Sequence, residues 1–377
     1  MTTPAPLPVC LGAPSPGGLA LPPATPTRSQ MYGPRGVFFN DEWFAAADSG
    51  NHRILLWRGL PESDGAEADV VLGQPDFTSE GPKLLHLPTG VVIHENRLLV
   101  ADAWHHRILV WNRIPDRSGT LPDYAIGQPG INATEINRGG AHPSALSLYW
   151  PYGMGFAAGW FWVADTGNRR VLGWPAIPGP DQPARVILGQ PAPDWGKENR
   201  GGPVCGRSFR WPHAIAGDDR RLFIADAGNH RVLCWSQVPN RDCDATGVLG
   251  QPGFSTAFEL PHVPQGPARL RFPYGAALEE DTLAVADTAN NRILIWEPAP
   301  DSASGPPATR VLGQDNFDAG GENRWTAVTP DSTCWPYAIC LHRGRLAIAD
   351  SGNNRVTVWD LSAARAPQPL KGGTVCA

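Results

Sequence analysis

The sequence predicts an all-β fold: a six-bladed β-propeller whose blades are four-stranded antiparallel sheets. Three observations support this prediction. Hydrophobic residues make up 42% of the 377-residue chain and charged residues 18%, with 42 Gly and 40 Pro, a composition that suits many short strands joined by turns. A strand–turn–strand phrase also occurs six times. The intervals between its copies are long enough for one four-stranded sheet each.

The repeated phrase ends one short apolar run with an aspartate and starts the next run with an arginine. IADAGNHRVLCW from Ile224 is one copy, and VADTGNRRVLGW from Val163 is another. The aspartates lie 54 to 63 residues apart, at Asp48, Asp102, Asp165, Asp226, Asp287 and Asp350. Each interval accommodates four strands, here called A to D, and a sizeable loop.

Strand A of each blade is expected to line the central channel. It begins at a proline, which is Pro34, Pro88, Pro151, Pro212, Pro273 or Pro336. A polar turn then leads into strand B, which ends at the aspartate, and a small turn such as Ser-Gly-Asn leads into strand C. Strand D ends in the sequence LGQP or a close variant, at Pro75, Pro129, Pro191, Pro252 and Asp315.

Only five such D strands follow a C strand, so the sixth blade must be completed at a chain end. Two segments fit, PVCLGAP from Pro8 and TVCA from Thr374. The first repeats the LGxP pattern, so residues 8–14 of an N-terminal segment 1–30 are expected to form the outer strand, with the propeller spanning 31–377. Such closure protects sheet edges. With the C-terminal alternative, residues 1–30 would be a loose arm.

Charge and cysteine content narrow the classes of function. The net charge of −5 and a pI near 6.1 do not favour a nucleic-acid partner. No apolar run reaches the roughly 20 residues of a membrane span and no leader is evident, so we expect a soluble, cytoplasmic protein without membrane contact. The seven cysteines form no CxxC pair, which favours reduced thiols over a metal or redox site. Cys10 and Cys376, near opposite ends, are the pair to inspect for a disulfide.

Features present in every blade are best explained by the fold. The six Asp/Arg pairs are therefore expected to be structural clasps, in which the carboxylate accepts hydrogen bonds from the arginine and from turn backbone groups. The tryptophans that close strand C are expected to wedge between sheets. They are Trp57, Trp111, Trp174, Trp235, Trp296 and Trp359.

The phrase resembles the NHL repeat, in the bacterial variant with the LGQP sequence. The resemblance rests on Asp, Asn and Arg at fixed spacing, as in Asp226, Asn229 and Arg231, and on literal Asn-His pairs. It covers the chain from about Tyr32 to Trp359. It implies a six-bladed propeller that binds a protein or a small molecule without chemistry, and bacterial relatives sometimes accompany redox enzymes such as hydrogenases. Animal relatives bind RNA through a strongly positive surface, which this composition does not favour.

Functional information should lie where the repeats differ. The residue after each strand A proline is expected to lie at one mouth of the channel, on the face that carries the B–C and D–A loops. These residues are Arg35, Thr89, Tyr152, His213, Tyr274 and Tyr337. Together they form a candidate site for a small polar or anionic ligand. The alternative is that they only plug the channel through hydrogen bonds to water.

Departures in the turns and loops suggest partner contacts. Trp104 and His105 replace the usual turn residues of the second blade, and the indole of Trp104 should project outward. Trp195 and Trp325 are each unique to one of the long D–A loops, which span 130–150, 192–211, 253–272 and 316–335. Long loops in a compact fold are usually functional. An Asn-Arg pair recurs in three of these loops and could instead be part of the structural repeat.

Two functions compete. We favour a non-catalytic scaffold that binds another protein or a small polar ligand through its long-loop face, with no cofactor, no metal and no catalytic residue assigned. The alternative is a metal-dependent hydrolase or lyase, with a site at the channel mouth, as in other propellers that hold a divalent metal. It would need His213 together with His86, His142 or His262 from overlying loops, because a catalytic zinc takes three protein ligands.

Overall fold

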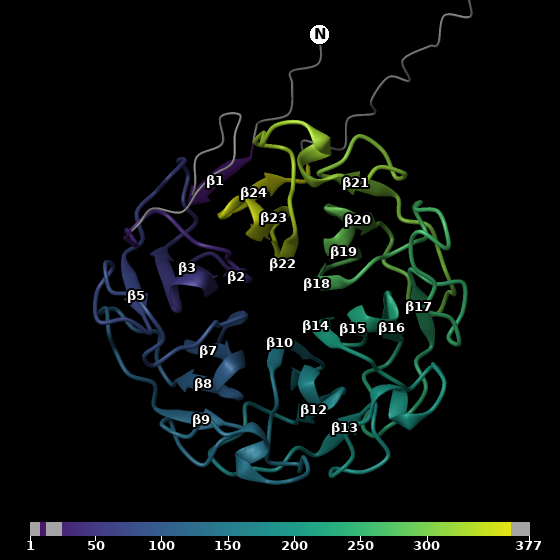
Figure 1. Cartoon of the computed structure of the whole chain (residues 1–377), viewed down its shortest axis with the longest axis horizontal. Coiled ribbons are helices and arrows are strands. Elements are labelled where there is room, and N and C mark those ends of the chain that lie inside the picture. The colour runs from purple at the N-terminus through teal and green to yellow at the C-terminus, as the bar shows by residue number, and fades with distance from the viewer. Residues whose placement is uncertain (1–7, 13–24, 363–377) are drawn as a thin grey trace, which may run out of the picture.

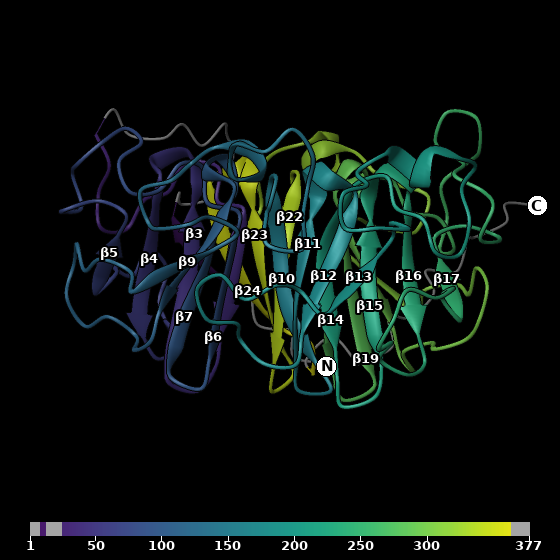
Figure 2. The ribbon, with the colours of Figure 1, turned by 90° about the horizontal axis from the view of Figure 1, so that it is seen from below.

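The computed structural model describes residues 8–12 and 25–362 of the chain. Six four-stranded antiparallel sheets form a ring around a central channel (Figure 1). The predicted six-bladed β-propeller is thereby confirmed. In the side view of Figure 2 the strands run between two faces of the ring. None of the helices among these residues is long and apolar enough to cross a membrane.

Each of the first five blades uses four consecutive strands. Blade 1 contains β2 (Gly36–Phe39), β3 (Trp43–Asp48), β4 (Arg53–Arg58) and β5 (Val70–Leu72). Blade 2 contains β6 (Gly90–His94), β7 (Arg97–Asp102), β8 (Arg107–Trp111) and β9 (Tyr124–Ile126). Blade 3 contains β10 (Pro151–Ala157), β11 (Trp160–Asp165), β12 (Arg170–Trp174) and β13 (Val186–Leu188).

Blade 4 contains β14 (Pro212–Gly217), β15 (Leu222–Asp226), β16 (Arg231–Trp235) and β17 (Gly247–Leu249). Blade 5 contains β18 (Pro273–Glu279), β19 (Thr282–Asp287), β20 (Arg292–Trp296) and β21 (Arg310–Leu312). The predicted D strands thus lie where the LGQ sequences placed them.

The B–C turns are short 3-10 helices, one in each blade: η1 (Ser49–Asn51), η2 (Ala103–His105), η4 (Thr166–Asn168), η6 (Ala227–Asn229), η7 (Thr288–Asn290) and η9 (Ser351–Asn353). Three more lie in the long D–A loops: η3 (Ile136–Gly139), η5 (Glu198–Gly201) and η8 (Glu322–Trp325).

The sixth blade joins the two ends of the described chain. Its strands are β22 (Pro336–His342), β23 (Arg345–Asp350), β24 (Arg355–Asp360) and, outermost, β1 (Val9–Gly12). β1 pairs antiparallel with β24, with Leu11 opposite Val356. Leu11 is fully buried between blades 6 and 1. The C-terminal segment from Thr374, and Cys376 with it, lies outside the described residues.

The Asp/Arg pairs form the expected clasps. In blade 3 the Nε of Arg170 donates to Asp165 at 2.7 Å and the side-chain amide of Asn168 donates at 2.8 Å. The backbone donor differs from the prediction: it is the N–H of Tyr149, in the loop before strand A and 16 residues from Asp165, at 2.7 Å. Arg170 also donates to the carbonyl of Pro193 at 2.6 Å. The clasp therefore ties the B–C turn to both neighbouring D–A loops.

Tryptophans at the ends of the C strands fill the spaces between blades. Trp174, for example, is almost fully buried in a cluster that also holds Ile108 and Val110 of the preceding blade. Trp57, Trp111, Trp235 and Trp296 are equally buried. Trp359 of the last blade is only half-buried, so five of the six act as the predicted wedges. One hydrophobic cluster lies between each pair of neighbouring blades. These six clusters fix the positions of the A strands around the channel.

Candidate functional site at the channel mouth

The six residues after the strand A prolines lie around one cavity. The cavity occupies about 230 Å³ in the centre of the ring and is lined by all six. In blades 3 to 6 the pairing of strand A with strand B shifts register directly after the proline, as between Pro151 and Met154. Such a bulge re-aims side chains. In these blades the side chain directly after the proline thereby lines the channel.

The aromatic side chains among these six residues contact one another in order around the channel. The ring centroids of Tyr152 and His213 are 4.5 Å apart, and those of His213 and Tyr274 are 4.3 Å apart and stacked. Tyr274 and Tyr337 follow at 4.9 Å. The guanidinium carbon of Arg35 lies 5.0 Å from the centroid of Tyr337. The structure thus brings five of the predicted site residues into a continuous arc.

Thr89 is the sixth residue of the ring, and its hydroxyl is already engaged. It donates to backbone carbonyls of the next blade, at 3.0 Å from the oxygen of Tyr152 and 3.3 Å from that of Pro151. The side chain is buried. Thr89 therefore serves mainly to join blades 2 and 3, and its donor is not directed at a ligand.

Arg35 is the only charged residue among those that line the cavity. Within the described part of the chain it has no carboxylate within ion-pair distance. A guanidinium stays protonated at any physiological pH. Among the described residues, the mouth of the channel therefore carries one positive charge, that of Arg35, without a carboxylate partner.

His213 is neutral at pH 7. Burial, helped by the nearby charge of Arg35, lowers its pKa to about 4. The Nδ1 of His213 lies 3.1 Å from the carbonyl of Trp211, so in the neutral ring Nδ1 donates and Nε2 remains an acceptor. Burial raises the pKa of Tyr152, against the influence of Arg35, and raises that of Tyr274 as well. Tyr152 and Tyr274 are hence protonated phenols that can donate hydrogen bonds.

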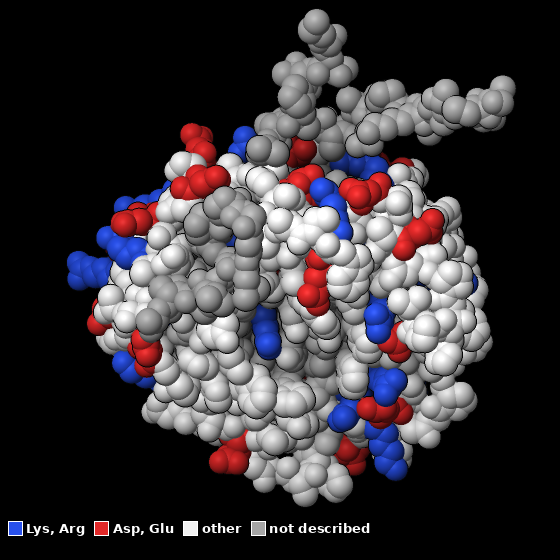
Figure 3. All heavy atoms as spheres, turned by 45° about the horizontal axis from the view of Figure 1, so that its top comes forward, with Lys and Arg blue, Asp and Glu red and all other residues white. Residues whose placement is uncertain are grey.

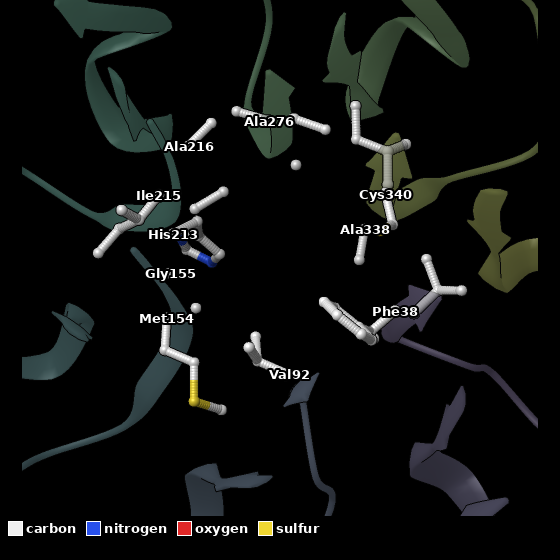
Figure 4. A pocket seen from close by; sticks show the side chains of 18 of the residues that line it. Phe38, Val92, Met154, Gly155, His213, Ile215, Ala216, Ala276, Ala338 and Cys340 are labelled. Atoms are coloured by element: carbon white, nitrogen blue, oxygen red, sulfur yellow. The ribbon is translucent and has the colours of Figure 1, made fainter. Parts of the chain in front are cut away.

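Below the ring the channel wall is apolar. Phe38, Val92 and Ala276 line it together with Cys340 (Figure 4). Burial raises the pKa of Cys340 to about 12, so its thiol is uncharged. The sequence analysis missed this wall. A signal was present, because the residue three positions after each mouth residue is uncharged in every blade: Phe38, Val92, Gly155, Ala216, Ala277 and Cys340.

The candidate partner contacts lie apart from the channel. The indole of Trp104 is 40% exposed and packs against His86 and Trp150, with centroid distances of 5.7 and 5.3 Å. His105 takes the place of the clasp asparagine, with its Nδ1 3.0 Å from Asp102. Its imidazole is thus part of a structural pair, at the same three-residue distance from the aspartate as the asparagine of the other clasps.

The other two candidates belong to separate loops. Trp195 is 38% exposed, and the ammonium group of Lys197 lies 5.0 Å from its ring. Trp325, at the end of η8, is 82% exposed, and Trp335 in the same loop is 40% exposed. Both line a second surface cavity, between the loops that lead into blades 5 and 6.

The recurring Asn-Arg pairs of the long loops are structural. The side-chain amide of Asn168 in the clasp donates to Asn137 at 2.8 Å, and Asn229 and Asn353 make the same bond to Asn199 and Asn323. Each loop asparagine has a left-handed backbone conformation. These loops are thereby fastened to the clasps beneath them.

The histidines do not assemble into a metal centre. His213 shares its ring with three tyrosines, an arginine and a threonine, and among the residues that line the cavity there is no further His and no Asp or Glu. His86 instead contacts His52 and His105. Across residues 8–12 and 25–362, no three His, Cys, Asp or Glu are grouped so that they could hold a metal ion. The donor set required by a catalytic zinc is not met at the mouth.

Charges on the outer surface are mixed. Lys and Arg alternate with Asp and Glu on the face shown in Figure 3, without a large area of one sign. Phosphate backbones are bound by clustered positive charge. The visible face offers no such cluster.

The fold is similar to that of one solved structure at a TM-score above 0.5. No protein-family model and no curated protein matches the sequence. Among solved structures, a protein of unknown function from Bacteroides thetaiotaomicron is 12% identical, with a TM-score of 0.52, over 93% of this chain and 73% of that one. Virginiamycin B lyase from Staphylococcus aureus is 14% identical, with a TM-score of 0.45, over 89% of this chain and 97% of that one. The WD40 β-propeller domain of Doa1 is 12% identical, with a TM-score of 0.45, over 93% of this chain and 96% of that one.

Proposed function

We propose that the protein is a non-catalytic propeller of the NHL type that binds a small anionic ligand at the channel mouth. The observation that carries the proposal is the lone charge of Arg35 in a cavity whose lining contains no carboxylate. Arg35 is partly exposed at the mouth, where hydrogen bonds between a guanidinium and an anion are stronger than those between neutral groups. A bound anion would supply the missing partner.

The neighbouring groups suit an anion as well. The phenols of Tyr152, Tyr274 and Tyr337 are donors that can share a carboxylate or phosphate oxygen with Arg35. Hydrogen bonds between a charged and a neutral group contribute about 1.5–3 kcal/mol each. His213 stays neutral through burial, so it adds no second positive charge that would favour a dianion.

Isothermal titration with sodium acetate and with inorganic phosphate tests this proposal. We expect an anion to bind the wild-type protein and to lose roughly 10- to 100-fold in affinity in the Arg35→Gln variant. Arg113→Gln, which changes an exposed arginine outside the cavity, is the matched control and should bind as the wild type does. Equal binding to Arg35→Gln and wild type would remove the basis of the proposal.

A protein partner is a second candidate, favoured by the exposure of Trp325. Large aromatic side chains are common anchors in protein interfaces, and this one stands beside a surface cavity with Trp335. A redox-enzyme partner, as in some bacterial NHL relatives, stays a prediction from the resemblance. If the surface is an interface, a partner isolated with the wild-type protein from its native cells should be lost from the Trp325→Ser variant.

A further inference from the structure

The channel below Arg35 adds a second requirement for the ligand. We propose that the ligand is a monocarboxylate with a compact apolar body about the size of a benzene ring. This inference rests on the anion site proposed above. The carboxylate lies at the mouth beside Arg35, and the apolar body extends down the channel between Phe38 and Val92 (Figure 4).

The charge of the site favours one negative charge over two. Among the described residues that line the cavity, Arg35 is the only Lys or Arg, and none is Asp or Glu. A monoanion is balanced by one guanidinium, whereas a phosphate dianion would bring an unpaired charge into the cavity at a cost. The planar guanidinium also matches the two oxygens of a carboxylate.

The chemistry of the wall favours an apolar body. Phe38 and Val92 present carbon atoms to the channel. Cys340 is protonated, and its Sγ lies 3.8 Å from the carbonyl oxygen of Phe39, to which it can donate. Polar groups of a ligand would lose water at this depth without gaining side-chain partners from these residues. Apolar groups would gain from leaving water.

The size of the cavity limits the body. It has a volume of about 230 Å³, whereas an apolar cavity of about 150 Å³ is known to hold benzene. The difference leaves room for a carboxylate and one small substituent. Drug-sized ligands usually occupy about 300–1,000 Å³. A six-membered ring with one carboxylate therefore fits, and a nucleotide does not.

A series of titrations tests the inference, with acetate, benzoate and cyclohexanecarboxylate as probes and wild-type protein as the receptor. Benzoate and cyclohexanecarboxylate should bind roughly 100-fold more tightly than acetate, because each buries five additional carbon atoms. The Val92→Asn variant places an amide in the wall. It should lower the affinity for benzoate at least about tenfold and change the affinity for acetate by less than a factor of two. An unchanged melting temperature of the variant is the control for correct folding.

The outcomes separate this inference from the function on which it rests. Equal affinity for acetate and benzoate, with both lost in Arg35→Gln, would overturn the apolar body and leave the anion site standing. Tighter binding of inorganic phosphate than of benzoate would overturn the monocarboxylate in the same way. Arg35-independent binding of every probe would overturn both proposals.

Discussion

Asp165 and Arg170 show how single residues hold this fold. Both side chains are fully buried, and the carboxylate and the guanidinium form an ion pair with each other. Burial raises the pKa of Asp165, while Arg170, the backbone N–H of Tyr149 and Asn168 counteract that shift. The arginines of the clasps are therefore unavailable to a ligand. Arg35 differs from them because it lacks a carboxylate partner among the described residues.

Removal of one clasp carboxylate should be strongly destabilising. Asp165→Ala leaves the buried guanidinium of Arg170 without its partner, which typically costs about 3–5 kcal/mol of unfolding free energy. The measurement is urea unfolding. The double variant Asp165→Leu with Arg170→Met removes both charges and should be less destabilised than the single variant. A double variant that is the less stable of the two would show that the unpaired guanidinium does not cause the loss in the single variant.

His213 should make stability depend on pH. Its pKa is lowered from 6.5 to about 4 by burial. The unfolded chain therefore binds the proton more tightly than the folded chain. The stability that His213 contributes is present above pH 6.5 and is lost as the pH falls towards 4, which amounts to about 3 kcal/mol.

Unfolding free energies of wild type and His213→Gln, compared at pH 7.5 and pH 4, test this prediction. Groups other than His213 titrate in both proteins and largely cancel in the difference. The difference should therefore move by about 3 kcal/mol in favour of the variant on acidification. A difference that stays constant between the two pH values would mean that the imidazole reaches solvent.

At the scale of elements, β1 determines how the ring closes. It supplies the outer strand of the sixth sheet, opposite β24, although the two are far apart in sequence. The backbone at Gly12 has a φ of +98° and a Cβ there would lie 2.6 Å from the carbonyl oxygen of Asn354. Only glycine fits that position without a shift of the backbone. The strand is thus fitted closely to its partner.

Truncation of Leu11 should reveal the contribution of β1 to stability. Its side chain is fully buried between blades 6 and 1, so Leu11→Ala should cost about 2–5 kcal/mol. The same change at Leu121, which is 64% exposed, should stay within about 0.5 kcal/mol. Thermal and urea unfolding provide the values. If the two variants proved equally stable, β1 would not be part of the cooperative unit.

Across the whole molecule, what repeats in the sequence could be predicted and what does not repeat could not. Six copies of one phrase defined the blades, and the proline before each mouth residue located the ring from Arg35 to Tyr337. The apolar wall follows from the same count, three residues further along each A strand. By contrast, the hydroxyl of Thr89 bonds to the backbone of the next blade, and no local pattern encodes that contact.

In the loops, too, repeated features could be predicted from the sequence and unrepeated ones could not. The link from Asn137 to Asn168 recurs in two other blades and was visible as a repeated Asn-Arg pair. The packing of Trp104 on His86 and Trp150 depends on an indole at a turn position that is glycine in four of the other blades. Such contacts depend on loop paths set by tertiary structure. The sequence therefore predicted that Trp104 would project outward, but not the side chains that it touches.

A crystal structure of the protein with 4-bromobenzoate tests the central claim most directly, since the anomalous signal of bromine locates the ligand without ambiguity. We expect the carboxylate at Arg35 and the bromine inside the channel, below the tyrosines and near Phe38 and Val92. Bromine found only on the outer surface, or a carboxylate turned away from Arg35, would contradict the account.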